Sequence, residues 1–182
     1  MLFRSEALRA ELGYGPDERV CLVTVGGSGV GSDLLKRVTD ALPEARRRVP
    51  DLRMIAVCGP RIDPAALGSH EGLEVAGYVH GLSRHLAACD VAVVQGGLTT
   101  CMELAAARRP FLYFPLRRHF EQNLHVRYRL ERYGAGRPMS FDTATPETIG
   151  EGIADALGEV PAAAEVERDG AARAARMIAT LL

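Results

Sequence analysis

The chain has 182 residues, 47% of them hydrophobic and 25% charged, so it can bury one complete core but not two full-sized ones. Its formal net charge is −1 at pH 7, which excludes the strong positive field of a general nucleic-acid binder. The four cysteines form no C-x-x-C pair and lie in or beside apolar runs, so we expect buried thiols and a reducing, cytoplasmic location. No run approaches the ~20 apolar residues that cross a bilayer, and we expect at most peripheral membrane association.

Short apolar runs alternate with segments of helical periodicity, which predicts an α/β fold with a parallel sheet. We expect residues 1–19 to be a linker containing a charged helix over 3–11. The first strand is expected over 20–25, followed by a glycine-rich turn and a helix. Pro43 interrupts the apolar stripe of that helix, so the helix either kinks there or a new one begins.

The same alternation continues to the end of the chain. Further strands are expected over 54–58, 73–76, 91–94 and 111–114, with a short extended piece near Met139. Helices are expected over 82–88, about 99–107, 120–132, 145–157 and 171–182, the fourth beginning at Thr145 and Pro146. Residues 20–182 are thus expected to form one Rossmann-like, three-layer domain with a parallel sheet of about six strands.

Ligands of open parallel sheets bind beyond the carboxyl ends of the strands, so the loops that follow strands are the candidate site. The loop at 26–31 is rich in glycine, which lets backbone N–H groups and a helix start face an anion. It matches neither G-x-G-x-x-G nor a P-loop, because its glycines are wrongly spaced and it has no lysine. The alternative is a tight turn that needs glycine for packing.

The loop at 95–100 also follows a buried strand and begins a helix, now with the hydroxyls of Thr99 and Thr100 in the first turn. Hydroxyls and unpaired N–H groups suit a diphosphate. Glu103 lies about one turn further on, where a carboxylate can accept both hydroxyl protons of a ribose. Thr100 and Glu103 also match a capping box, which would be a purely structural role.

A third polar loop follows the strand at 111–114. Residues 116–123 include two cations, an imidazole, a carboxylate and two amides, which suit a charged, polyhydroxylated ligand. The alternative is a solvated helix start. The remaining histidines and the cysteines have no metal-site spacing, so we expect no metal.

Several motifs, taken in order, resemble those of a known family. They are Gly-Gly-Ser-Gly after the first strand, Gly77-Tyr78-Val79 after the third, Q-G-G-L-T-T-C-M-E from Gln95 to Glu103, R-P-F-L-Y-F-P, and E-Q-N. Together they resemble the C-terminal, donor-binding domain of GT-B glycosyltransferases, above all the MurG-like enzymes of family 28. The resemblance covers residues 20–157, and it is more distant to the UDP-glucuronosyltransferases.

The resemblance implies a role for each matching residue. Gly27, Ser28 and Gly29 would contact the diphosphate and the acceptor side, and Tyr78 and Val79 would contact the uracil. Gly97, Leu98, Thr99 and Thr100 would bind the phosphates, and Glu103 would bind the ribose. Gln122, with Glu121 or Asn123, would bind the sugar hydroxyls. Two positions depart from the pattern. Gln95 replaces the histidine of the glucuronosyltransferases, so His119 or Arg118 would have to supply a cationic phosphate contact. Val126 replaces an asparagine, which leaves the sugar open.

The resemblance also implies a reaction. It predicts the donor-binding half of an inverting glycosyltransferase that needs no metal or other cofactor and moves N-acetylglucosamine or a related hexose from a UDP-sugar to an acceptor. The catalytic base is expected on an N-terminal, acceptor-binding domain or a separate partner subunit, so we expect this chain alone to be inactive. An excised half is favoured over a natural subunit, and the full enzyme is expected to work at the inner face of a membrane, without nucleic acid.

Two functions from other classes are also compatible with these residues. A sugar-nucleotide epimerase or hydrolase of the same fold would use the same nucleotide contacts without an acceptor. A non-catalytic nucleotide-binding subunit would need no base at all.

Overall fold

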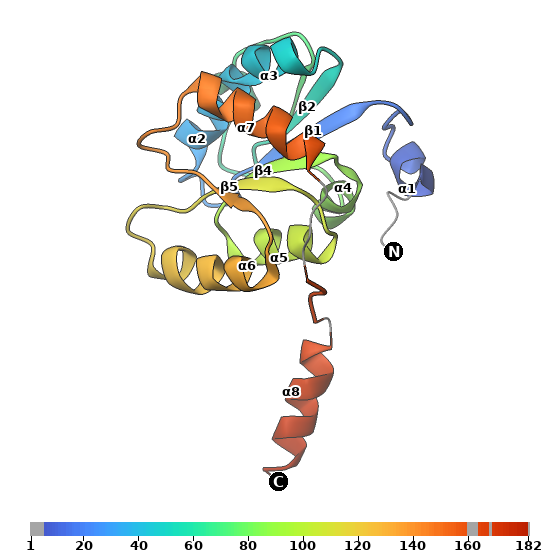
Figure 1. The fold of residues 1–182 in the computed structure, drawn as a ribbon, viewed down its shortest axis with the longest axis vertical. Helices are drawn as coiled ribbons and strands as arrows, with labels where there is room; N and C mark the ends of the chain where they lie inside the picture. Colours follow the sequence, from blue (N-terminus) through green and yellow to red (C-terminus); the bar gives the residue numbers. More distant parts are fainter. Residues whose placement is uncertain (1–5, 160–163, 168, 182) are drawn as a thin grey trace.

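The computed structural model describes residues 6–159, 164–167 and 169–181. Its centre is a sheet of six strands in the order β3-β2-β1-β4-β5-β6, and every neighbouring pair of strands is parallel. Helices cover both faces of this sheet (Figure 1). The expected α/β class and the parallel, Rossmann-like sheet are therefore confirmed.

The strands and helices alternate along the chain. The strands are β1 (Arg19–Thr24), β2 (Leu52–Val57), β3 (Leu73–Ala76), β4 (Val91–Gln95), β5 (Phe111–Phe114) and β6 (Arg137–Pro138). The helices are α1 (Glu6–Glu11), α2 (Ser32–Asp40), α3 (Leu42–Arg48), the 3₁₀-helix η1 (Pro64–Ala66), α4 (Leu82–Ala88), α5 (Leu98–Ala106), the π-helix η2 (Glu121–Val126), α6 (Arg127–Tyr133), α7 (Pro146–Gly158) and α8 (Gly170–Ala179).

Two apolar cores lie on opposite faces of the sheet. Alternate residues of a strand point to opposite faces, so Cys21 and Val23 of β1 pack with α2, α3 and α7, whereas Val20 and Leu22 pack with α4, α5 and α6. Figure 1 shows these two groups of helices above and below the sheet. The expected three-layer arrangement is confirmed. Helix α8 stands apart from both layers and has no buried residue.

Most helices begin where the sequence indicates. Pro43 does not kink one helix: α2 ends before it, and Pro43 lies in the first turn of α3. Thr145 caps α7 and forms a reciprocal pair of hydrogen bonds with Thr148. The segment expected as one helix over 120–132 instead begins with the π-helix η2 and continues as α6. Phe3, the expected start of the first helix, lies outside the described residues.

The four cysteines are buried free thiols, as expected. Burial raises the pKa of Cys89 and of Cys101 to about 12. Both thiols therefore stay protonated at neutral pH, which favours a packing role over a nucleophilic one.

Arg9 fastens α1 to the sheet. Its side chain is 2% exposed and donates to the carbonyl oxygen of Ala88 (2.7 Å) and to Oδ2 of Asp90 (3.1 Å). It also donates to two carbonyl oxygens in the turn before β1. The same Asp90 oxygen accepts from the N–H of Val20 at 2.8 Å. The ion pair therefore joins α1 to the beginnings of β1 and β4. The linker role of residues 1–19 stays a prediction.

Replacing Asp90 by alanine should destabilise the domain by about 3–5 kcal/mol, because the buried guanidinium of Arg9 loses its counter-charge. Urea unfolding, followed by circular dichroism, measures this change. Glu11→Ala is the matched control, since it removes an exposed pair between α1 and Arg84 and should cost less than about 1 kcal/mol. Similar losses in the two variants would contradict the anchoring role of Asp90.

Candidate functional site

The order of the strands creates a crevice between β1 and β4. The chain leaves β1 toward β2 and β3 on one side, and it returns to β4 on the other side. Thr24 and Val94 are paired in the sheet, so the loops that follow β1 and β4 begin side by side. Ligands of open parallel sheets bind at this reversal of strand order. The loops at 26–31 and 95–97 therefore form the centre of the candidate site.

Helices α2 and α5 both start at this crevice with a glycine at the N-cap. Gly31 precedes α2 and Gly97 precedes α5, and neither helix start receives a capping hydrogen bond from a described side chain. Helix α7, outside the crevice, has a full capping box. The N–H of Ser32, the first of α2, donates to the carbonyl oxygen of Gly29 at 3.3 Å. The next N–H groups of α2, from Asp33 and Leu34, and the first N–H groups of α5 have no intrahelical acceptor, so they can bind an anion. Gly27, Ser28 and Gly29 lie in the loop before α2.

The capping-box interpretation of Thr100 and Glu103 is wrong. Helix α5 begins at Leu98, so Thr100 is its third residue, and Gly97 occupies the N-cap position. Leu98, Thr99 and Thr100 thus form the uncapped first turn. Glu103 is half-buried, and its carboxylate has no hydrogen-bond or ion-pair partner within the described parts of the chain. A half-buried carboxylate without a partner is available to a ligand.

The third polar loop is tied to the glycine turn after β4. Oε1 of the buried Gln122 accepts from the N–H of Leu116 at 2.8 Å. A β-carbon at Gly96 would lie 3.3 Å from this oxygen and 3.1 Å from Cα of Pro115, so the approach requires glycine. Nδ2 of Asn123 donates to the carbonyl oxygen of Leu116 at 2.7 Å. The two amides therefore shape the loop, in addition to the sugar contacts that the resemblance assigns to them.

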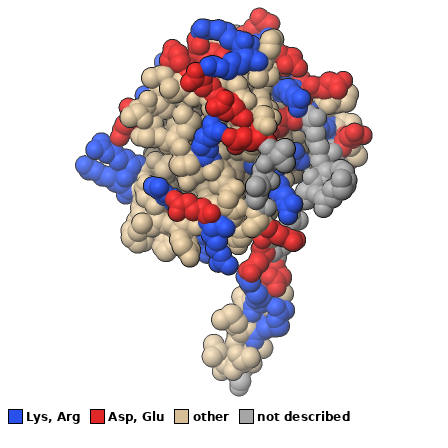
Figure 2. Space-filling model, viewed as in Figure 1, with Lys and Arg blue, Asp and Glu red and all other residues tan. Residues whose placement is uncertain are grey.

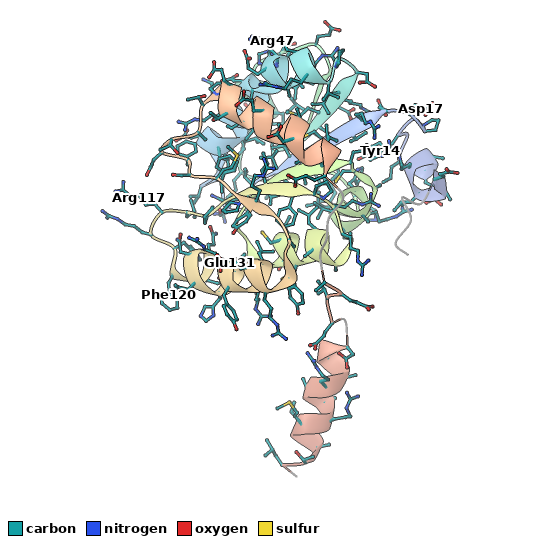
Figure 3. All side chains as sticks on the ribbon, viewed as in Figure 1. Tyr14, Asp17, Arg47, Arg117, Phe120 and Glu131 are labelled. Carbon is teal, nitrogen blue, oxygen red and sulfur yellow. The ribbon has the colours of Figure 1, made fainter. Side chains whose placement is uncertain are left out.

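The other residues expected near the sugar or the phosphates differ in exposure. Glu121, His119 and Arg118 are exposed, and Nδ1 of His119 accepts from the N–H of Gln122 at 3.4 Å. Val126 is wholly buried in the core, so it contributes no contact to a ligand. Arg117 extends from the same loop into solvent (Figure 3).

A cavity of about 490 Å³ opens beyond the ends of β4, β5 and β6. Gln95 and Asn123 line it, together with Asp33 of α2 and residues 138–142. The guanidinium of Arg37 lies 3.7 Å from the ring centre of Phe141 and donates to the carbonyl oxygen of Ala144 at 3.1 Å. These contacts hold the loop after β6 against α2, so the far wall of the cavity is fixed.

The loops after β2 and β3 border a second cavity of about 550 Å³. Tyr78 lines it with 76% of its side-chain surface exposed, whereas Val79 packs against the core. Neighbouring strands lie about 4.8 Å apart, so the ends of β3 and β4 are separated by roughly 14 Å. An extended molecule, rather than a single ion, would be needed to contact both.

Arg61 is a residue of this cavity that sequence reasoning missed. Gly29 has φ +79°, and a β-carbon there would lie 3.3 Å from Cβ of Arg61, so the loops after β1 and β2 are in contact. Arg61 is exposed and has no ion-pair partner within the residues that the structure describes. In the sequence, Gly59 and Pro60 indicate only the end of a strand, and nothing there shows that Arg61 meets the glycine loop.

Two kinds of feature are absent from the described part of the chain. No group of three or more His, Cys, Asp or Glu side chains is arranged to hold a metal ion. No described helix is both long and apolar enough to cross a membrane.

Comparison with known proteins identifies the family. Residues 20–181 match the sequence model of the glycosyltransferase family 28 C-terminal domain. An uncharacterized glycosyltransferase of Methanopyrus kandleri is 30% identical over 97% of this chain and 49% of its own length. A UDP-N-acetylglucosamine–N-acetylmuramyl-(pentapeptide) pyrophosphoryl-undecaprenol N-acetylglucosamine transferase of Carboxydothermus hydrogenoformans is 32% identical over 59% of this chain and 30% of its own length. The chain thus spans at most about half of these relatives.

Solved structures show the same fold. MurG of Acinetobacter baumannii superposes with a TM-score of 0.65 and 17% identity, covering 94% of this chain and 52% of that protein. A putative UDP-N-acetylglucosamine 2-epimerase of Listeria monocytogenes gives a TM-score of 0.66 at 17% identity, covering 96% and 46%. The architecture, the crevice at the reversal of strand order and the family match agree: this chain belongs to the glycosyltransferase family 28 C-terminal domains, of the MurG-like GT-B type.

Proposed function

We propose that this chain is the donor-binding half of an inverting, metal-independent glycosyltransferase. Its donor is a UDP-sugar, with N-acetylglucosamine or a related hexose as the sugar. The observation that carries this proposal is the pair of uncapped helix starts at the crevice, with the unpartnered Glu103 one turn into α5. Uncapped N–H groups suit the diphosphate, and the carboxylate suits the ribose hydroxyls.

In the proposed reaction, an acceptor hydroxyl attacks the anomeric carbon, and the bond from that carbon to the UDP oxygen breaks. Negative charge grows on the departing diphosphate as the bond breaks. Each helix start carries roughly half a positive charge, so α2 and α5 together would stabilise that charge without a divalent cation. The N–H groups are fixed before the reaction, which avoids the cost of reorganising solvent.

The acceptor-binding site and the catalytic base are not assigned to residues of this chain. The relatives are about twice as long, which supports an N-terminal, acceptor-binding half or a partner subunit that provides the base. We accordingly propose that the chain alone is inactive, that it needs no cofactor beyond its donor, and that the complete enzyme works in the cytoplasm at the membrane face. The undecaprenol-linked acceptor named for the relatives supports this location.

A sugar-nucleotide epimerase or hydrolase remains the second candidate. The putative UDP-N-acetylglucosamine 2-epimerase of Listeria monocytogenes has the same fold. Such an enzyme would use the same nucleotide contacts, but it would convert a UDP-sugar without an acceptor. Incubation with UDP-N-acetylglucosamine and no acceptor, followed by product analysis, distinguishes it from a transferase.

Glu103→Ala should weaken UDP binding by about 10- to 100-fold, the range expected when hydrogen bonds to a charged group are lost. Isothermal titration calorimetry measures the affinity. The variant and the parent chain should bind 2′,3′-dideoxyuridine diphosphate equally, because this ligand has no ribose hydroxyls for Glu103 to accept from. Glu71→Ala is the control, because that side chain is 89% exposed and outside the crevice. No UDP binding by the parent chain, or equal binding by Glu103→Ala, refutes the proposal.

Arg61→Ala should reduce the affinity for UDP about tenfold and leave the weaker affinity for uridine unchanged. The reason is that a guanidinium contacts the diphosphate and not the nucleoside. Rising salt should reduce the difference between the two chains. Arg19→Ala, an exposed arginine at the start of β1, is the control. An equal loss for uridine and UDP would show that Arg61 shapes the cavity without contacting phosphate.

A further inference from the structure

Three large apolar side chains are exposed in one row along η2 and α6. Phe120, just before η2, is 68% exposed, Leu124 is 54% exposed and Tyr128 is 67% exposed. Figure 3 shows Phe120 on the side of this helical segment that faces away from the sheet. We name these three residues the apolar stripe.

The stripe reverses the usual pattern of a surface helix. Gln122, Val126 and Leu130 already bury the inner face of η2 and α6, so the outer face should be polar. Instead, an apolar side chain recurs every four residues on the side turned to solvent. A contiguous exposed apolar row on a helix indicates an interaction surface.

Positive charge surrounds the stripe. Residues 117–133 contain five arginines and two glutamates, an excess of three positive charges in a chain whose net charge is −1. Two of these arginines are paired, Arg127 with Glu131 at 2.8 Å and Arg117 with Asp142 at 3.7 Å. Arg118 and Arg129 have no ion-pair partner within the described residues. The charge of this surface is thus complementary to an anionic partner.

A small cavity adjoins the stripe. It has a volume of about 230 Å³, enough for a phosphate group. It is lined by His125, Tyr128, Arg129, Arg132 and Tyr133. Two guanidinium groups and an imidazole at one cavity are a set of donors suited to a phosphate.

We propose that this face of the domain docks on the surface of a bilayer that contains anionic phospholipids. The apolar stripe lies at the boundary between headgroups and acyl chains, and Arg129 and Arg132 bind a lipid phosphate in the adjoining cavity. An amphipathic helix with an aromatic and aliphatic row flanked by arginines is the arrangement that binds such interfaces. Aromatic rings are also favoured at headgroup depth.

The shape of this face favours a bilayer over a peptide ligand. Helix α6, which carries Tyr128 of the stripe, lies beside α5 in the helical layer at the lower left of Figure 1. The corresponding part of Figure 2 is mostly uncharged, with basic groups and one acidic group beside it. A protruding row of side chains can enter a lipid surface directly. The inference goes beyond the proposed donor site and does not depend on it.

Co-sedimentation of the 182-residue chain with vesicles tests the proposal. Vesicles of phosphatidylcholine with one third phosphatidylglycerol should bind the chain at least about tenfold more tightly than vesicles of phosphatidylcholine alone. The double variant Leu124→Ser, Tyr128→Ser should lose about tenfold or more of that binding. Arg129→Gln should lose about fivefold, and salt should weaken the binding of the parent chain.

Matched variants separate this face from other surfaces. Met177→Ser, Ile178→Ser removes two exposed apolar side chains of α8, and Arg19→Gln removes an exposed arginine of β1. Neither should change vesicle binding. The Leu124→Ser, Tyr128→Ser variant should keep the parent chain's affinity for UDP and its thermal unfolding midpoint. If the parent chain did not bind UDP, the proposed donor would be refuted, but the result of the vesicle experiment would be unaffected.

Three outcomes would overturn the membrane proposal. One is equal binding to both kinds of vesicle, and another is unchanged binding by the stripe variant. The third is a stripe variant that changes only self-association in sedimentation velocity, which would assign this face to a second copy of the chain.

Discussion

The reversal of strand order between β1 and β4 is the constraint on which the rest of the site depends. It places two loops side by side and turns two helix starts toward one crevice. A helix start carries partial positive charge whatever its sequence, so the fold provides the electrostatics before any side chain does. The sequence adds the absence of side-chain caps: with Gly31 and Gly97 at the N-cap positions, no described side chain caps α2 or α5, whereas the side chain of Thr145 caps α7. The candidate site is therefore mainly backbone.

Side chains in this region mostly position that backbone. Oε1 of Gln122 accepts a hydrogen bond from the N–H of Leu116 and lies close to Gly96. The loop after β5 and the turn after β4 are therefore fixed relative to each other. Arg37 does the same for the loop after β6 through the ring of Phe141. A change at either residue would shift a wall of the cavity, whatever direct contact with a ligand it also removed. Sugar selectivity in such a site depends on supports that a motif search does not detect.

Much of the fold could be predicted because local signals agree with the tertiary structure. β3, α4 and β5 have the predicted bounds, since a glycine or a proline follows or bounds each strand and the intervening residues have a clear period. The sequence also predicted which loops follow the carboxyl ends of strands. The capping box was wrong because a threonine and a glutamate three residues apart do not show where a helix begins, and this helix begins earlier, after Gly97. Arg61 was missed because its place beside Gly29 depends on a contact between two loops far apart in the chain, and the periodicity over 120–132 does not distinguish a π-helix from an α-helix.

The buried ion pair of Arg9 and Asp90 has a mechanical consequence. It fixes α1 to Asp90, the residue just before β4. The other end of β4 leads into the turn at Gly96 and Gly97. In a longer two-domain enzyme, closure would require a pivot that absorbs backbone rotation, and a pivot at Arg9 would have to break this buried ion pair. With the ion pair intact, α1 and β4 would move together as one rigid unit.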